Sequence, residues 1–408
     1  MMENKVKYRL DQNINFAYQS SPAIKNIFDE AGLKPGDIQS IADLEKVPVT
    51  SKDKMVELQN SNPPFGGFLA IHIDNLQHVF LSPGPLYEPS SGDSAAIDSI
   101  GEVLSIAGFG TGDIVLNAFG YHLIPTGLLV DQELRKIGAT VIPAGVGNAE
   151  LQIKILRDLK VTGYVGTPSW LMTLLEKIPK TNQDLSAALF LQKVLVSAEP
   201  LPPSMREVFT REFGLQVINA YGTAELGFLA VNIDGSMPMQ LLGSSIIEVV
   251  DPDTGLKVNP GDVGEVVATV FNKTYPLIRL GTGDLAMNVD PRPGESQQEE
   301  RAIILVGRSG EAVKVRGMLV HPNQLRYSVG QVPGIERFQA IVSRPNNRDS
   351  LMLKVVLSAS DQDPEPIQEM VIQMVKSYCR VNVDQIIFVN REQIGPDEPI
   401  ILDQRSWD

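Results

Sequence analysis

Cysteine is almost missing from this chain of 408 residues, since Cys379 is the single one. No disulfide can therefore form within the chain, which is typical of a protein kept in a reducing compartment. Cys379 lies in an apolar helical pattern, so we expect a buried packing thiol. Histidine is also rare, and its four positions lack the spacing of metal ligands: His72, His78, His122 and His321. The sequence therefore argues against a structural zinc site.

Basic residues are outnumbered, because 35 lysines and arginines face 49 aspartates and glutamates and leave a formal net charge of −14. Binding to nucleic acid or to an anionic membrane needs basic patches, so this balance argues against both kinds of partner. No apolar run approaches the roughly 18 residues of a membrane span. Residues 1–7 also lead into no apolar core of the signal-peptide type. We therefore expect a cytoplasmic protein.

Several common site motifs are absent as well. The sequence contains no Gly-x-x-x-x-Gly-Lys-Ser/Thr phosphate loop and no Gly-x-Ser-x-Gly nucleophile elbow. The glycine-rich run 108–112 precedes an expected strand as a turn and does not match a dinucleotide fingerprint. These absences argue against a P-loop nucleotidase, a nicotinamide enzyme of Rossmann type and a serine hydrolase.

What the sequence does contain is an alternation of short apolar runs with amphipathic helical patterns. Strands are expected at 113–119, 139–143, 162–166, 193–197 and 215–220, and helices at 126–137, 148–159, from 167 onward and at 203–213. Repeated strand–helix units of this kind predict an α/β fold with a doubly wound, mostly parallel sheet.

The composition also divides the chain into regions. We expect a large N-terminal domain over 1–307, with a helical lead-in (1–64), an α/β core (65–243) and a small β subdomain (244–307). Thr50 or Ser51 is expected to cap a helix at the end of the lead-in. Residues 308–408 then form a smaller α+β domain, with helices expected at 322–331 and 364–379.

Two polar segments follow consecutive apolar runs of the core. Ser197-Ala-Glu-Pro200 comes after one run, and Asn219-Ala-Tyr-Gly-Thr-Ala-Glu225 comes after the next. Open α/β sheets bind ligands in loops at the carboxyl ends of their strands. A tyrosine ring, a glycine and a carboxylate in this order can supply a stacking face, a close backbone approach and a metal-facing anion. We therefore expect these segments to be loops that form a ligand site.

The two segments resemble the adenine-binding and Tyr-Gly-x-Thr-Glu elements of the adenylate-forming superfamily. Further segments, in the same order, resemble the phenylacetate–CoA ligase family of that superfamily. They are Leu44–Lys52, Asn117–Leu123, Gly138–Pro143, Gly166–Trp170, Ile278–Asp284 and Gly307–Gly317. The resemblance covers most of the chain, and it implies that 308–408 is a mobile lid domain.

The resemblance also implies roles for single residues. Adenine would lie against Ser197, Ala198, Glu199, Pro200, Asn219, Ala220 and Gly222, with Tyr221 stacked on it. Asp284 would accept hydrogen bonds from the ribose hydroxyls, assisted by Arg308. Glu225 would bind Mg²⁺, and Tyr121, His122, Gly166, Thr167 and Pro168 would line the pocket of a carboxylic acid. Gly317 would face coenzyme A, and a homodimer is common in the family.

The sequence departs from the family where the β- and γ-phosphates of ATP are bound. The family's Ser-Ser-Gly-Thr-Thr-Gly-Lys-Pro loop corresponds to Ser82-Pro-Gly-Pro-Leu-Tyr-Glu-Pro89. Pro85 supplies no N–H and Leu86 no hydroxyl, while Glu88 replaces the lysine with a like charge. We therefore expect this loop to bind a triphosphate poorly.

Other phosphate-side residues differ too. Ala224 replaces the hydroxyl residue before the glutamate, although Thr223 is next to it. Ile400 takes the position of the C-terminal catalytic lysine, and Lys314 is a cationic candidate in its place. The hinge acid corresponds to Gly310, with Glu311 following.

Three interpretations fit this pattern. The first is an ATP-dependent acid–CoA ligase of phenylacetate–CoA ligase type, in which ATP and acid yield an acyl-adenylate and pyrophosphate before CoA attacks. The second is an enzyme that performs only the acyl-transfer half-reaction. The third is a non-catalytic descendant that binds AMP, an acyl-adenylate or an acyl-CoA. The ligase ranks first, because the positions that face adenosine are retained.

Overall fold

The computed structural model describes most of the chain. The described residues are 2–82, 86–92, 95–178, 190–308, 310, 312–316, 318–345, 349–359, 363–379, 381–395 and 398–405. They form two compact units. The first comprises Met1–Glu248, Val267–Thr282 and Val289–Ile304, and the second Val249–Val266, Gly283–Asn288 and Leu305–Asp408. The predicted domain boundary at 307 and 308 and the movement of a lid domain stay predictions.

The first unit opens with helices, as the sequence predicts for the lead-in. They are α1 (Met2–Ser20), α2 (Pro22–Glu30) and α3 (Lys52–Ser61). Ser51 is the residue that caps α3, because its Oγ accepts a hydrogen bond of 3.1 Å from the amide of Lys54. The capping oxygen starts the helix at Lys52, so this residue lies in its first turn.

A parallel sheet follows, with helices between its strands. The strands are β3 (Ile114–Asn117), β4 (Thr140–Pro143), β5 (Gly163–Gly166), β6 (Lys193–Val196) and β7 (Gln216–Thr223). The helices are α4 (Ala95–Ile106), α5 (Thr126–Lys136), α6 (Ala149–Asp158), α7 (Pro168–Glu176) and α8 (Pro203–Glu207). Neighbouring strands lie in the order β4-β3-β5-β6-β7 and pair in parallel. The predicted α/β sheet is therefore confirmed.

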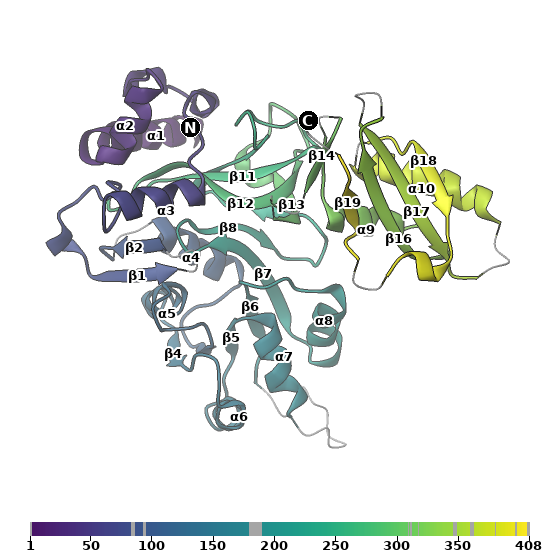
Figure 1. The fold of residues 1–408 in the computed structure, drawn as a ribbon. Coiled ribbons are helices and arrows are strands. Elements are labelled where there is room, and N and C mark those ends of the chain that lie inside the picture. Colours follow the sequence, from purple (N-terminus) through teal and green to yellow (C-terminus); the bar gives the residue numbers. More distant parts are fainter. Residues whose placement is uncertain are drawn as a thin grey trace. The chain divides into compact units, whose positions relative to one another are not determined.

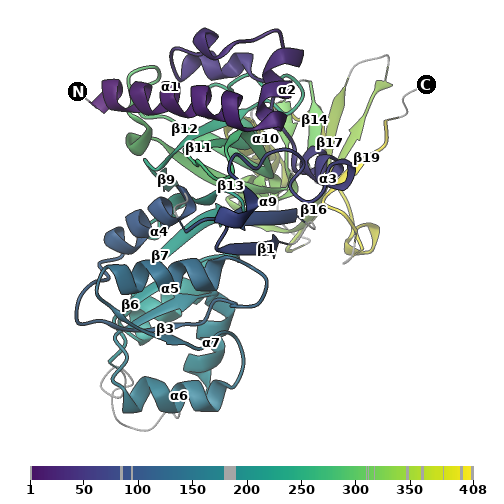
Figure 2. The ribbon, with the colours of Figure 1, turned by 90° about the vertical axis from the view of Figure 1, so that its left-hand side faces the viewer.

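Alternate residues of each strand belong to different cores on the two faces of the sheet. On β6, Leu195 packs in a core that includes residues of α4 and α5, whereas Val194 and Val196 pack in a core with residues of α6 and α7. Side chains alternate across a strand, so a run that is apolar throughout is buried on both faces. Figures 1 and 2 show helices on both sides of these strands.

Beyond β7 the sheet continues through further strands that include antiparallel pairs. The full sheet has the order β10-β11-β12-β13-β9-β8-β7-β6-β5-β3-β4. The added strands are β8 (Gly227–Asn232), β9 (Met239–Leu241), β10 (Ser245–Val250), β11 (Val263–Val270), β12 (Leu277–Val289) and β13 (Ala302–Arg308). Asn219 to Thr223 belong to β7 and pair with β8. The strand predicted at 215–220 is therefore confirmed and extends to Thr223, so the prediction of a loop was wrong for Tyr221 to Thr223.

A separate two-stranded hairpin carries the segment that resembles a phosphate loop. Its strands β1 (His78–Ser82) and β2 (Leu86–Ser90) pair in antiparallel fashion, with Phe80 opposite Glu88. The burial of β2 alternates at Tyr87, which is exposed, and Glu88, which is buried. The sequence analysis did not predict strands here.

The second unit contains a four-stranded sheet in the order β18-β17-β16-β19. Its elements are β14 (Val313–Val315), β15 (Met318–Val320), α9 (Pro322–Gly330), β16 (Ile335–Ser343), β17 (Ser350–Leu357), α10 (Pro364–Cys379), β18 (Gln385–Phe388) and β19 (Ile401–Asp403). Both predicted helices are present. Cys379 is buried as expected, and burial raises the pKa of its thiol to about 11. None of the helices described here is long and apolar enough to cross a membrane.

Candidate functional site

Tyr221 lies near the end of β7, next to a distortion of the strand. The pairing with β8 shifts register between Tyr221 and Gly222. A Cβ atom on Gly222 would lie 2.3 Å from the carbonyl oxygen of Gly227, so only glycine fits this close approach. The Tyr221 hydroxyl donates a hydrogen bond of 3.3 Å to Thr282 Oγ1 and leaves the ring partly exposed. The tyrosine is therefore held at its hydroxyl while the residue stays partly accessible.

Glu225 follows β7 and is buried, with only 1% of its side chain exposed. Lys52 Nζ lies 3.2 Å from Glu225 Oε2 and forms an ion pair with it. Among the described residues this oxygen has no partner with hydrogen-bond geometry, and neither does Thr223 Oγ1. The carboxylate thus keeps acceptor capacity for a further ligand.

Lys52 is placed by backbone hydrogen bonds between distant parts of the chain. The amide of Thr50 donates to Arg279 O over 3.0 Å, and the amide of Gly281 donates to Thr50 O over 2.9 Å. Arg279 is itself fully buried, and its Nε lies 3.1 Å from Glu248 Oε2. These contacts fix the start of α3 beside β12, so that Lys52 can reach Glu225.

Glu88 lies beside the same cavity as Glu225, and the sequence analysis did not place it there. Only 6% of Glu88 is exposed, and it lines a small cavity of about 30 Å³ together with Glu225 and Tyr275. Burial and the neighbouring Glu225 carboxylate raise the pKa of Glu88 to about 8. The sequence analysis treated Glu88 as a charge in a phosphate loop. Glu88 is two residues from the apolar Leu86, a spacing that places both on one face of a strand, and this was the signal that could have indicated its burial.

The segment Ser197–Pro200 follows β6 beside the segment that follows β5. The amide of Ser197 donates to Gly166 O over 3.2 Å. Glu199 is exposed, and its Oε2 accepts a long hydrogen bond of 3.4 Å from the amide of Ser169 in α7. The structure therefore brings the predicted adenine segment next to the predicted acid segment at the carboxyl ends of neighbouring strands.

The other predicted acid-pocket residues are held in different ways. Thr167 caps α7, since its Oγ1 accepts from the amide of Trp170, and Pro168 is the first residue of that helix. The Tyr121 hydroxyl accepts a hydrogen bond of 2.8 Å from Asn117 Nδ2 and donates one of 3.1 Å to Asp131 Oδ2. Burial, followed by the charge of Asp131, raises the pKa of Tyr121. His122 is exposed.

In the second unit, Asp284 and Arg308 lie together. Arg308 Nη1 is 3.1 Å from Asp284 Oδ1, and 63% of the arginine side chain is exposed. The neighbouring amide of Gly283 donates to Glu265 Oε1 over 2.8 Å. Lys314 belongs to β14, but its side chain is outside what the structure describes, and Gly317 and Glu311 also fall outside it.

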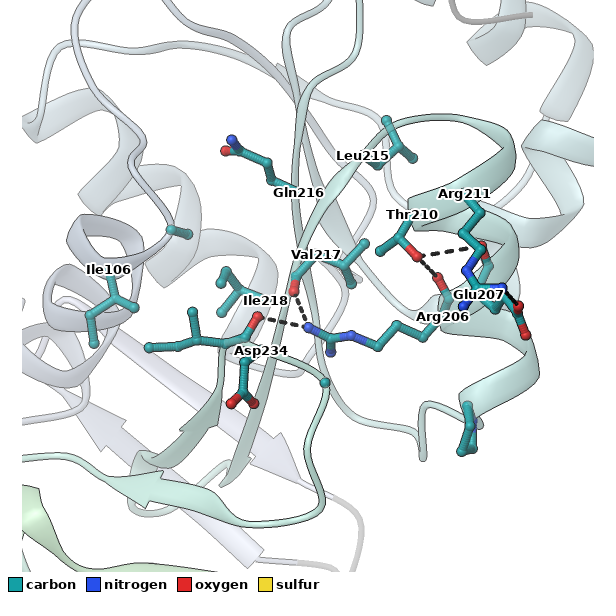
Figure 3. Close-up of a pocket in the computed structure, with 14 residues that line it drawn as sticks. Ile106, Arg206, Glu207, Thr210, Arg211, Leu215, Gln216, Val217, Ile218 and Asp234 are labelled. Carbon is teal, nitrogen blue, oxygen red and sulfur yellow. Dashed lines mark hydrogen bonds and ion pairs between the residues drawn. The ribbon is translucent and has the colours of Figure 1, made fainter.

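A larger groove lies elsewhere in the first unit. It measures about 650 Å³ and is lined by Ile106, Arg206 and the start of β7 (Gln216–Ile218). Figure 3 shows Arg206 directed at backbone oxygens, and its Nη2 donates to Val217 O over 2.7 Å and to Ile233 O over 2.8 Å. The groove lies at the opposite end of β7 from Tyr221, and Arg206 is engaged by the fold itself. None of the predicted site residues lines it.

Known proteins are similar to this chain in sequence and in fold. The family described as "AMP-binding enzyme" matches residues 135–269. The phenylacetate–coenzyme A ligase of Thermus thermophilus is 28% identical over 401 residues, which is 95% of this chain and 87% of that protein. The same enzyme of Escherichia coli is 28% identical over 370 residues, or 86% of this chain and 82% of that protein.

A solved structure of 2-hydroxyisobutyryl-CoA ligase, in an open conformation with 2-HIB-AMP and CoA, matches this fold. Its TM-score is 0.83 at 21% identity, covering 98% of this chain and 91% of that one. At this identity the likeness concerns the fold, which is that of the adenylate-forming enzymes. The sequence matches extend over most of the length of both partners. The chain is therefore similar to the phenylacetate–coenzyme A ligases over most of its length and has the fold of the acyl-CoA ligases.

Proposed function

We propose that the protein is an ATP-dependent carboxylic acid–CoA ligase of phenylacetate–CoA ligase type. In the first step the carboxylate attacks the α-phosphorus of ATP and releases pyrophosphate, which leaves an acyl-adenylate. In the second step the thiol of CoA attacks the acyl carbon and AMP leaves. The observation that carries the proposal is the homology to phenylacetate–CoA ligases over 95% of the chain.

The nucleoside part of the site supports this proposal. Tyr221 offers a partly exposed ring that is fixed through Thr282, which suits stacking on adenine. Ser197, Ala198, Glu199, Pro200, Asn219, Ala220 and Gly222 would border the base. Asp284 would accept from the ribose hydroxyls, and Arg308, 3.1 Å away, would orient that carboxylate.

The acid and CoA subsites follow from the same resemblance. Tyr121, His122, Gly166, Thr167 and Pro168 would line the acid pocket, and the acid would be a small carboxylate, aryl acids included. In this proposal Gly317 would face CoA, and Lys314 would lie near the phosphates. The proposal also includes that the protein forms a homodimer and is located in the cytoplasm.

Mg²⁺ would be held by Glu225, and the residues present fit it. Glu225 Oε2 and Thr223 Oγ1 are buried oxygens that lack hydrogen-bond partners in the described part of the chain. Mg²⁺ prefers hard oxygen ligands and is commonly bound by one or two carboxylates and by phosphate oxygens. When bound, the ion would neutralise charge on the phosphates.

A second candidate is an enzyme limited to the thioester step, or a protein that only binds AMP or acyl-adenylate. The buried carboxyl of Glu88 favours it, because the family places a lysine at this position to bind phosphate. A carboxyl group beside Glu225 offers no positive charge to a triphosphate. AMP and acyl-adenylates carry no β- or γ-phosphate and do not need this charge.

One set of assays separates these candidates. The purified protein is incubated with Mg·ATP, CoA and a panel of alkyl and aryl acids, and pyrophosphate and acyl-CoA are measured. In parallel, a synthetic acyl-adenylate replaces ATP and acid. Pyrophosphate release with acyl-CoA formation supports the ligase, and acyl-CoA from the acyl-adenylate alone supports the thioester-only enzyme. If neither product forms while AMP still binds in calorimetry, a binding protein is favoured.

Asp284→Asn tests the ribose assignment in the same assays. We expect it to raise the KM for ATP, or the Kd for AMP, by tenfold or more. Asp43→Asn is the matched control, because this half-buried carboxylate pairs with Lys46 and lies outside the proposed site. Equal behaviour of the two variants would remove Asp284 from the nucleotide site.

A further inference from the structure

The turn between β14 and β15 contains an arginine in an unfavourable backbone conformation. Val315 pairs with Met318, so Arg316 and Gly317 join the two strands. Arg316 has a φ of +51°, in the left-handed region that glycine adopts freely and that costs free energy for a residue with a Cβ atom. An arginine at this position therefore needs side-chain contacts that compensate for the strain, and glycine could not make them.

The contacts of Arg316 lead to two other segments of the second unit. Its amide donates a hydrogen bond of 3.0 Å to Asp349 Oδ2, and its Nε donates one of 3.0 Å to Asp349 O. Its Nη1 donates to Asn382 O over 3.3 Å, and its Nη2 pairs with Asp384 Oδ2. Asp349 directly precedes β17, and Asp384 directly precedes β18. The turn is therefore attached to one end of the four-stranded sheet through the amide and all three side-chain nitrogens of Arg316.

Asp349 is the centre of this attachment. Only 8% of its side chain is exposed, and it also pairs with Arg344 Nε at 2.9 Å and with Arg405 Nη1 at 3.3 Å. Arg405 in turn pairs with Asp403, the last residue of β19, at 2.7 Å. Exposed ion pairs separate easily, whereas a nearly buried carboxylate with several arginine partners holds them in one arrangement. Asp349 thus fixes the turn to the ends of β16 and β19 as well.

We propose that Arg316, Asp349 and Asp384 form a turn clamp that positions the β14–β15 turn for CoA in the thioester step. The inference rests on the proposed ligase function, in which Gly317 of this turn would face CoA. A hairpin of two three-residue strands has little stability by itself, so the contacts of its turn decide how rigidly it is held. The three residues of the turn clamp are positioning residues, and they act on the reaction only through the turn.

Arg316→Gly tests the turn clamp, because glycine removes the side chain and adopts the positive φ without strain, so the variant should fold. The thioester step is measured with a synthetic acyl-adenylate and varied CoA, and adenylation is measured by pyrophosphate exchange. We expect the KM for CoA to rise at least tenfold while pyrophosphate exchange stays within twofold of wild type. Asp349→Asn should show the same split, because it replaces the carboxylate that accepts from the turn.

Arg391→Gly is the matched control, since 68% of this arginine side chain is exposed and it pairs with Glu336 at the start of β16. It should keep the wild-type KM for CoA. The turn clamp is overturned if Arg316→Gly, folded by circular dichroism, also keeps that KM. It is equally overturned if both half-reactions fall by the same factor, because a loss of stability alone would lower both.

Calorimetry with CoA distinguishes this failure from failure of the proposed function. If wild type neither binds CoA nor forms acyl-CoA, the proposed function and the turn clamp are both overturned. If wild type binds CoA and forms acyl-CoA while Arg316→Gly does so equally well, only the turn clamp is overturned. A Kd for CoA that is at least tenfold higher in Arg316→Gly than in wild type supports the turn clamp.

Discussion

Lys52 and Glu225 form an ion pair in which the glutamate is almost fully buried and 28% of the lysine side chain is exposed, with 3.2 Å between Nζ and Oε2. One partner comes from the first turn of α3 and the other from the residues after β7. The pair therefore joins the N-terminal helical segment to the centre of the candidate site.

Replacing Lys52 by methionine should destabilise the protein, because Glu225 would remain buried without its counter-ion. We expect a loss of about 1–3 kcal/mol in the free energy of unfolding, measured by urea denaturation at pH 7. Lys54→Met is the matched control two residues along α3, since its pair with Glu57 is exposed on both sides. That change should stay within about 0.5 kcal/mol of wild type. Equal stability of both variants would mean that the buried carboxylate does not depend on Lys52.

Glu88 should make stability fall as pH rises. Burial and Glu225 raise its pKa in the folded protein to about 8, above an unfolded value of about 4.3. Between these values the folded state holds the proton more tightly than the unfolded state. The stabilisation is therefore present at low pH and is lost toward pH 8, by up to about 1.4 kcal/mol per pH unit.

The measurement compares urea unfolding of wild type and Glu88→Gln from pH 4.5 to 8.5 in the presence of EDTA, so that no divalent ion contributes. Relative to the variant, wild type should lose stability with rising pH. Parallel curves across this range would show that Glu88 is ionised in the folded protein at neutral pH.

Tyr221 should contribute to AMP binding through its ring and not through its hydroxyl. Stacking of a base on an aromatic side chain contributes about 1–3 kcal/mol. Tyr221→Ala is therefore expected to weaken AMP binding by about tenfold or more in calorimetry. Tyr221→Phe removes the hydroxyl and its hydrogen bond to Thr282 and should bind AMP within about threefold of wild type. A larger loss in the phenylalanine variant would assign the role to the hydroxyl.

Restoring the family lysine at Ile400 should increase acid adenylation. Ile400 is only partly buried and lies at the edge of the core formed by β16, β17 and α10. A single donor to the transition state contributes on the order of 10²–10³ in rate. Pyrophosphate exchange by Ile400→Lys should therefore rise at least tenfold over wild type, whereas Ile400→Met should leave it unchanged. No gain in the lysine variant would argue against the alignment of this position.

The regular part of the fold was accessible from the sequence because its signals are local. The apolar runs that became β3, β5 and β6, and the cap and proline that start α7, each specify their own element. Tyr221 to Thr223 were misassigned to a loop because they pair with β8, and that pairing depends on the partner strand.

The candidate site could be predicted from the sequence only in part, for the same reason. The motif segments lie at the ends of β5, β6 and β7, which adjacent parallel strands bring together, while their role as a ligand site stays a prediction. The meeting of Glu88, Glu225 and Lys52 depends on three segments that are far apart in the chain. No local pattern encodes which buried charges face each other. Tertiary packing decides that.

The backbone contacts of Thr50 with Arg279 and Gly281 have a consequence for folding. They close a loop of more than two hundred residues, and such contacts are entropically costly until the intervening chain is ordered. Lys52 can reach Glu225 only after this closure. The site should therefore appear as one of the last cooperative events during refolding, and fragments that contain β7 without the first sixty residues should lack it altogether.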